Sequence, residues 1–318
     1  MHITFYGVRG SLPTPLDSTS LERKVLGAVN AVMAKKIKTA KSADKFIKNA
    51  PFSLTHTYGG NTMCVEVRAD DGRRLILDGG SGLRMLGNRI LKEGFGKGQG
   101  EAHILLSHFH VDHLHGIPFF VPIFIPGNKI NFYAGHTHAA ESLARYISPP
   151  LFPIAFDLLA STRSVTLVRP GEQYEINGFK VSAHPLNHPN DCFAYRIESG
   201  GQTVVYATDS EFMDRPPDEH RAYVDFFRNA DCLIADAQYS IADSLVTKTG
   251  WGHSSFNIDI DLACEANVKR LVFCHYDPLM TDEEIDQLLA DANEYLNFAK
   301  TGKRLALDVA CEERELTL

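Results

Sequence analysis

The sequence lacks the features of a membrane-spanning, secreted or nucleic-acid-coating protein. No stretch of its 318 residues approaches the roughly 18 consecutive apolar residues of a membrane span. The first residues show no basic segment followed by a long apolar one, so we expect no membrane partner and a cytoplasmic location. The formal net charge of -7 argues against a nucleic acid polymer as partner, because phosphate binding by counterion release requires a basic surface.

Cysteine is also scarce, and its pattern argues against disulfide bonds and cysteine zinc clusters. The six cysteines are scattered and form no C-x-x-C pair, so we interpret them as buried free thiols, neither disulfides nor zinc clusters. No repeat, low-complexity tract or linker divides the chain. With 44% hydrophobic residues, the chain has enough apolar material for a large core. We therefore expect residues 1–318 to form a single domain.

Residues 16–50 differ in composition from the rest of the chain. They carry eight basic and three acidic residues, a local charge of +5, and their apolar residues recur at helical spacing. This pattern predicts a solvated amphipathic helix or helical hairpin. The alternative is a lid or dimer arm that adds positive potential for an anionic ligand, and a second copy of the chain is therefore a candidate partner.

Most of the remaining sequence reads as two successive blocks of strands with helices between them. Short apolar or alternating runs lie between glycine-rich turns, as in buried strands. The expected strands cover 63–69, 74–78, 102–107 and 129–133 in the first block, and 165–168, 179–184, 192–198, 203–208, 232–236 and 270–275 in the second. Helices are expected over 82–93, 115–121, 137–147, 256–267 and 282–299. Such an order predicts an α/β (α+β) fold in which two sheets pack face to face with helices outside.

The strongest chemical signal follows the apolar run 104–106. His108, His110, Asp112 and His113 lie within six residues, and burying four polar side chains without strong partners costs several kcal/mol. A metal is the natural partner. A spacing of two places His108 and His110 on one side of an extended chain, and a turn then brings Asp112 and His113 towards a second ion.

Three further candidate ligands follow expected strands of the second block. His188, Asp209 and His275 each lie at or just beyond a strand end, where they can complete the coordination. Histidines with one or two carboxylates fit a centre of two divalent ions, Zn or Mn, and Asp209 is able to bridge them. Asp78, in a D-G-G-S-G turn, is expected to fix the ligand loop through hydrogen bonds.

The sequence resembles the metallo-β-lactamase-fold hydrolases. The family signature H-x-H-x-D-H is present at 108–113, and the earlier strand-turn motif appears at 77–82. The resemblance implies a four-layer αββα sandwich with the metals at one edge between the sheets. It also implies the ligand sets, namely one metal held by His108, His110 and His188, the other by Asp112, His113 and His275, with Asp209 as the bridge.

Two further segments resemble the ribonuclease Z and phosphodiesterase branch of this family. Residues 251–255 resemble its G-H-S-T element and contain His253. Residues 233–237 resemble the strand whose Glu orients that histidine, but this chain has Asp236, whose shorter side chain predicts a longer or water-mediated contact. Residues 7–11, 58–62, 152–153 and 275–278 resemble a bacterial group of cyclic nucleotide phosphodiesterases, relative to whose shorter members residues 16–55 look like a helical basic insertion.

These patterns predict a dinuclear metal-dependent phosphodiester hydrolase, an enzyme for a small anionic phosphodiester such as a cyclic nucleotide. We expect metal-bound hydroxide, oriented by Asp112, to attack phosphorus while His253, held by Asp236, protonates the leaving group. One alternative is a ribonuclease Z-like endonuclease, although 114–183 contain no basic, glycine-rich arm for RNA. Another is a non-catalytic ligand sensor on the same fold.

Overall fold

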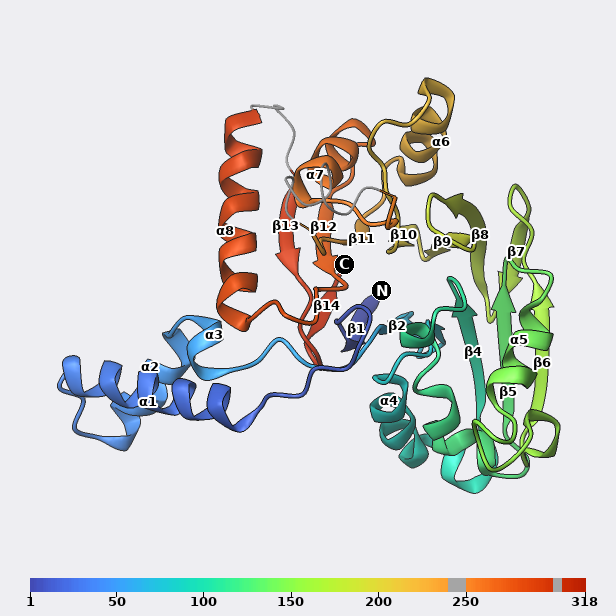
Figure 1. The fold of residues 1–318 in the computed structure, drawn as a ribbon, viewed down its shortest axis with the longest axis horizontal. Helices are drawn as coiled ribbons and strands as arrows, with labels where there is room; N and C mark the ends of the chain where they lie inside the picture. Colours follow the sequence, from blue (N-terminus) through green and yellow to red (C-terminus); the bar gives the residue numbers. More distant parts are fainter. Residues whose placement is uncertain (240–249, 300–304) are drawn as a thin grey trace.

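Two seven-stranded sheets dominate the structure, a computed structural model that describes residues 1–239, 250–299 and 305–318 (Figure 1). The first sheet has the order β14-β1-β2-β3-β4-β5-β6, with strands β1 (His2–Gly7), β2 (Cys64–Arg68), β3 (Arg74–Leu77), β4 (Glu101–Leu106), β5 (Lys129–Ala134), β6 (Thr162–Leu167) and β14 (Glu315–Thr317). The second has the order β13-β12-β11-β10-β9-β8-β7, with strands β7 (Gln173–Ile176), β8 (Phe179–Leu186), β9 (Cys192–Ser199), β10 (Gln202–Ala207), β11 (Cys232–Asp236), β12 (Arg270–Cys274) and β13 (Ala306–Val309).

The main hydrophobic core lies between the two sheets. Successive side chains of a strand point to opposite faces, so the fully buried strands contribute to two cores. Leu105 packs in the core shared with the second sheet, whereas Ile104 and Leu106 pack in a separate core under the helices of the first sheet. Strands β3 to β6 are parallel, and burial of both faces explains the continuous apolar run of β4.

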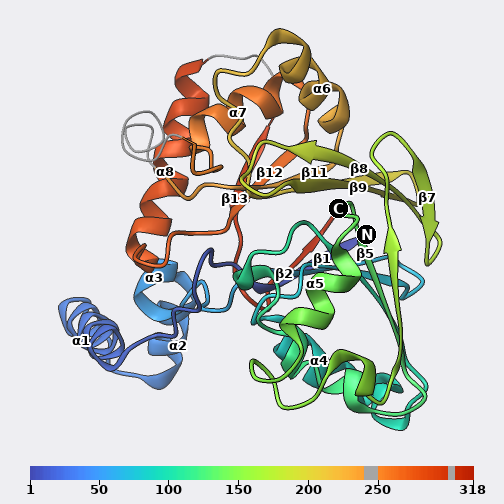
Figure 2. The same cartoon turned by 45° about the vertical axis from the view of Figure 1, so that its right-hand side comes forward.

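Helices cover the outer faces of both sheets, which completes the four layers expected from the sequence (Figure 2). Helices α4 (Leu83–Ile90) and α5 (Ala139–Tyr146) lie on the first sheet, and α6 (Pro217–Phe227), α7 (Phe256–Glu265) and α8 (Asp282–Ala299) lie on the second. The helix expected over 115–121 is instead a pair of short 3-10 turns, Ile117–Phe119 and Val121–Phe124, each with a proline at its start. Helix α6 and strand β7 were not predicted. Among the described residues, no helix is both long and apolar enough to cross a bilayer.

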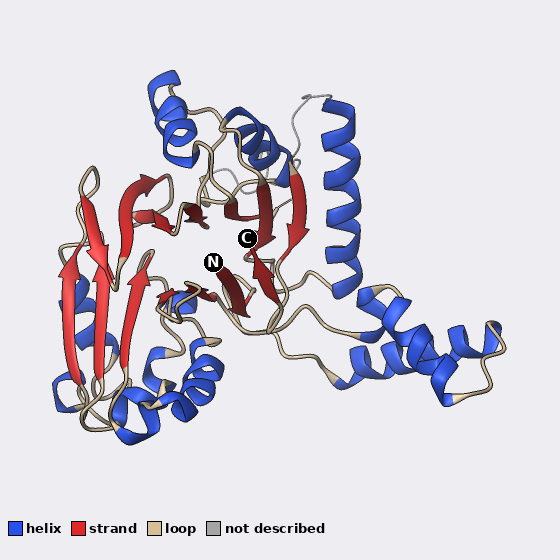
Figure 3. Cartoon of the chain, turned by 180° about the vertical axis from the view of Figure 1, so that it is seen from behind, coloured by secondary structure: helices blue, strands red, loops and turns tan. Residues whose placement is uncertain are grey.

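The segment expected to be helical near the N-terminus contains α1 (Ser18–Ala34), α2 (Ala40–Asn49) and α3 (Phe52–Thr55), and α1 and α2 extend away from the sheets (Figure 3). Helix α1 has no buried residue. Its base is tied to α8, because Lys24 Nζ lies 2.8 Å from Asp282 Oδ2 and the Ser53 N–H donates to Asp286 Oδ2 at 3.2 Å. The hairpin is therefore solvated, as its composition predicted.

Candidate metal centre

The candidate ligands come together at one edge of the sandwich, where strand ends of the two sheets face each other. The loop after β4 supplies His108 to His113, and the connections after β8, β10 and β12 supply the other three. Asp78, Asp209 and His275 have left-handed backbones, with φ of 60°, 64° and 55°. Such a conformation costs about 1–3 kcal/mol for a residue with a side chain and concentrates at functional sites.

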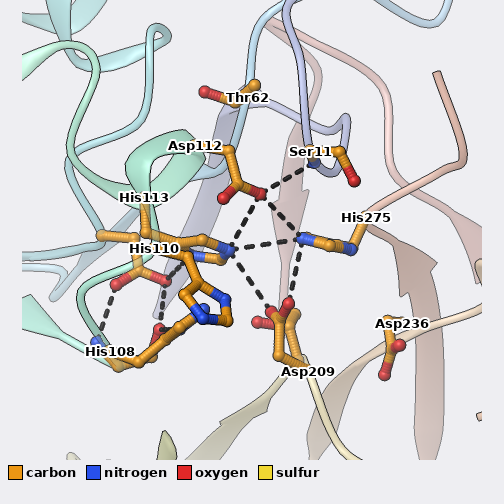
Figure 4. A network of polar contacts seen from close by, with 12 residues as sticks. Ser11, Thr62, His108, His110, Asp112, His113, Asp209, Asp236 and His275 are labelled. Carbon is orange, nitrogen blue, oxygen red and sulfur yellow. Dashed lines mark hydrogen bonds and ion pairs between the residues drawn. The ribbon is translucent and has the colours of Figure 1, made fainter. Parts of the chain in front are cut away.

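One group of ligand atoms has the spacing of a tetrahedral site (Figure 4). His275 Nε2 lies 3.3 Å from Asp112 Oδ2 and 3.1 Å from Asp209 Oδ1. His113 Nε2 lies 3.3 Å from both Asp112 Oδ2 and His275 Nε2, and 3.5 Å from Asp209 Oδ2. Ligands at about 2.0–2.1 Å from a tetrahedral zinc would lie about 3.3–3.4 Å apart. Asp112, His113 and His275 therefore fit one divalent ion, and Asp209 lies within reach of the same position.

A second group adjoins the first through Asp209. His110 Nδ1 lies 3.1 Å from His188 Nε2, and His108 can offer a nitrogen within the same small volume. His108 Nε2 and Asp209 Oδ2 are buried, and neither atom forms a hydrogen bond with any described residue. Two orphaned polar atoms in a buried position are costly, and a cation between them would remove that cost.

In three of the histidines, the hydrogen bond made by Nδ1 indicates that Nε2 carries the lone pair. His113 Nδ1 lies 2.7 Å from Asp78 Oδ2, His188 Nδ1 lies 2.9 Å from the Gly252 carbonyl and His275 Nδ1 lies 3.1 Å from Gln238 Oε1. Each of these partners accepts, so each Nδ1 donates and, in a neutral ring, Nε2 presents a lone pair to the centre. The lone pairs of His113 and His275 therefore face the first group, and that of His188 faces the second.

The pKa shifts of His113 and Asp209 indicate that the centre stabilises positive charge. Burial opposes a charged His113, but Asp112 and Asp209 outweigh burial and raise its pKa well above the usual range. Burial likewise opposes an ionised Asp209, but His275 and His113 outweigh it and lower the pKa of that carboxyl. Without ions, protons on His113 and His275, whose pKa is also raised, therefore balance the two carboxylates.

Asp78 is the hub of the surrounding hydrogen bonds, as its turn motif predicted. Its carboxylate accepts from the Ser107 N–H, the Ser107 hydroxyl, His113 Nδ1 and the Tyr206 hydroxyl, each at 2.7 Å. The side chain is fully buried. It therefore holds both the start and the end of the ligand loop in place.

His253 and Asp236 form a buried pair beside the two groups. His253 Nδ1 lies 2.8 Å from Asp236 Oδ2, so the expectation of a longer or water-mediated contact is wrong. The end of β11 and the turn before α7 bring the two backbones close enough for the shorter carboxylate to reach the ring. The ring of His253 stacks on His275, with centroids 5.1 Å apart.

Several groups that hold the ligands carry no signal in the sequence. The Ser11 N–H donates to Asp112 Oδ2 at 2.8 Å, and the Gly252 carbonyl accepts from His188. Both are backbone groups, so the residue types at these positions do not reveal the contacts. Gln238 holds His275, and only its place two residues after Asp236 could have drawn attention to it.

Two glycines are required where the backbone approaches the ligand rings. A Cβ on Gly10 would lie 2.3 Å from Cε1 of His275, and a Cβ on Gly252 would lie 2.1 Å from Nδ1 of His188. Gly252 also has a φ of 82°, which other residues rarely adopt. These glycines therefore let the chain pack directly on the candidate ligands.

The chain belongs to the beta-lactamase superfamily, because the model of the Beta-lactamase superfamily domain matches residues 73–276, more than half of its length. Ribonuclease Z from Agathobacter rectalis is 23% identical over 250 residues, which cover 64% of this chain and 81% of that protein. The probable metallo-hydrolase YhfI from Bacillus subtilis is 24% identical over 219 residues, covering 68% of this chain and 84% of that protein.

Solved structures share the fold over nearly the whole chain. The crystal structure of YhfI superposes with a TM-score of 0.64 at 18% identity, covering 99% of this chain and 98% of that one. Unliganded yeast PDE1 superposes with a TM-score of 0.64 at 12% identity, covering 100% and 99%. The family match and the two packed sheets confirm the metallo-β-lactamase fold expected from the H-x-H-x-D-H signature.

Proposed function

We propose that this metal-dependent hydrolase of the metallo-β-lactamase fold is a dinuclear phosphodiesterase for a small phosphodiester such as a cyclic nucleotide. The observation that carries the proposal is the His253 and Asp236 pair, which lies directly beside two adjoining cation sites. Breaking a phosphodiester expels an alkoxide, which needs a proton, and a histidine held by a buried carboxylate is suited to supply it. Relatives named ribonuclease Z, enzymes that cut phosphodiester bonds, support this bond type.

Seven side chains are proposed to hold the two ions. His108, His110 and His188 would hold one, Asp112, His113 and His275 the other, and Asp209 would contact both. When bound, two divalent ions, Zn or Mn, would lower the pKa of water and neutralise phosphoryl oxygens. The carboxylates and rings are held by the protein before the substrate arrives, through Asp78, Gln238, Gly252 and the Ser11 N–H.

Three side chains are proposed to act on the reacting atoms or on the acid. Asp112 has Oδ2 fixed by the Ser11 N–H and is placed to accept a hydrogen bond from the attacking water. His253 donates a proton from Nε2 to the departing oxygen. Asp236 keeps Nδ1 of that ring protonated and stabilises its positive charge, so the proton that leaves is the one on Nε2.

A hydrolysis panel with the Zn- and Mn-loaded protein tests the proposal. We expect turnover of a cyclic mononucleotide, two bound ions per chain by metal analysis, and no processing of a precursor tRNA. Cleavage of the precursor tRNA alone would establish the ribonuclease Z-like alternative. Tight binding of a nucleotide without turnover would establish a sensor.

A further inference from the structure

A cavity of about 360 Å³ is lined by segments that flank the candidate metal centre, and its lining residues have no role in the proposed hydrolysis. Its lining is mainly apolar and comes from three separate segments. Leu12 and Pro13 come from the turn after β1, Arg84 from the start of α4, and His115 and Phe119 from the turns that follow the ligand loop.

Two of the segments that line the cavity also carry groups of the candidate metal centre. The Ser11 N–H donates to Asp112 Oδ2 at 2.8 Å, and Leu12, the next residue, lines the cavity. His115 lines it as well and lies two residues after His113. The segments that carry the Ser11 contact and His113 therefore also line the cavity. Figure 4 shows Ser11 beside Asp112 and His275.

The side chains that line the cavity are those of a site for a planar group. Leu12 is 60% exposed and Phe119 is 59% exposed, so both offer apolar surface to a ligand in the cavity. The Phe119 ring packs edge-on against Phe152, with centroids 6.2 Å apart, which limits its rotation. Arg84 is exposed and forms no ion pair or side-chain hydrogen bond with any described residue, so its guanidinium is available to a ligand.

We propose that this cavity binds the base of a nucleotide, with Phe119 and Leu12 against the base and Arg84 donating to acceptor atoms on its edge. The inference rests on the proposed function and names its substrate class. Aromatic rings bind every base through stacking, and a guanidinium presents a planar fork of donors that suits base acceptors. A volume near the lower end of the range for ligand pockets suits a single nucleoside group.

Binding to the metal-loaded protein tests the cavity directly. We would measure dissociation constants for 5′-AMP and 5′-GMP and for ribose 5-phosphate, which has the same phosphate and sugar but no base. We expect Phe119→Ala to weaken binding of the nucleotides by roughly 5-fold to 150-fold and to leave ribose 5-phosphate unchanged. Phe298→Ala removes an even more exposed ring, 84% exposed, from the end of α8 and should change nothing. Arg84→Gln should also weaken only the nucleotides.

Hydrolysis separates this inference from the proposed function. A cyclic nucleotide and the corresponding cyclic ribose phosphate without a base would be compared, with the expectation that the base lowers KM and that Phe119→Ala removes the difference. Equal KM values for the two diesters, or equal weakening of nucleotide and ribose 5-phosphate in Phe119→Ala, would overturn the base site. If neither diester is cleaved but the base-dependent binding is present and is lost in Phe119→Ala, the base site stands and the proposed phosphodiesterase function fails.

Discussion

Removal of the His253 side chain should impair hydrolysis in proportion to how poor the leaving group is. The ring is 8% exposed and donates to Asp236 at 2.8 Å, so its orientation is fixed before the substrate binds. A positioned general acid typically contributes a rate factor of about 10² to 10⁴. This factor corresponds to about 2.7–5.4 kcal/mol of transition-state stabilisation.

The factor applies only where the departing oxygen needs a proton. We expect His253→Ala to lower kcat for a cyclic nucleotide by about 10² to 10⁴. Bis(p-nitrophenyl) phosphate releases p-nitrophenolate, which leaves without a proton, so its kcat should fall much less. Asp236→Asn keeps an acceptor for Nδ1 but removes the negative charge. Its kcat for the cyclic nucleotide should therefore lie between that of the native protein and that of His253→Ala.

The assay is steady-state kinetics with both substrates on the metal-loaded proteins. His220→Ala is the matched control, because His220 Nε2 is also paired with a carboxylate, Glu265 Oε2 at 2.7 Å, but on the protein surface. The spared rate with bis(p-nitrophenyl) phosphate, together with unchanged metal content, would show that His253→Ala is folded. Equal losses with the two substrates would refute the assignment of His253 as the general acid.

Three further predictions concern the centre itself. Asp209→Ala removes the carboxylate shared by both groups and should lower the bound metal from two ions per chain, as measured by elemental analysis; retention of both ions would contradict the bridging role. Gly10→Ala should displace the His275 ring and lower the metal content. Gly27→Ala, whose new Cβ meets only the flexible end of Leu54, should leave the metal content unchanged. Unchanged metal content in both variants would show that the His275 ring accommodates the methyl group. In the chelated protein, the raised pKa of His113 stabilises the fold fully below about pH 6.5, and this contribution is lost as pH rises through the raised pKa. Added metal should therefore increase the melting temperature more at alkaline than at neutral pH. An equal increase at both pH values would contradict the balance between protonated histidines and carboxylates.

Much of the candidate site was predictable because the ligands follow strands that are easy to recognise. The run Ile104 to Leu106 is buried on both faces, and its end places His108 and His110 at the edge of the sheet. The same holds for Asp209 after β10 and His275 after β12. Strand ends of parallel or mixed sheets meet at common edges, so spacing along the chain carries information on proximity.

Other features could not be predicted, because they depend on distances between segments remote in sequence. The direct contact of His253 with Asp236 depends on the path of two backbones, and a comparison of side-chain lengths led to the wrong expectation. Helix α6 begins at Pro217, the second of two consecutive prolines, and was missed, although a proline at the first helical position is favourable. The short turns at 117–124 replace a helix because their prolines lack an N–H.

The sequence alone determined the chemistry available to this protein: which residues can bind divalent ions, that two sheets are present and that an acidic body carries a basic helical segment. The tertiary structure decided how that chemistry is held. The Ser11 N–H on Asp112, the Gly252 carbonyl on His188 and the cavity beside Phe119 join segments far apart in the chain. Every residue has a backbone carbonyl and every residue except proline has an N–H, so only packing in three dimensions selects the ones that position a ligand.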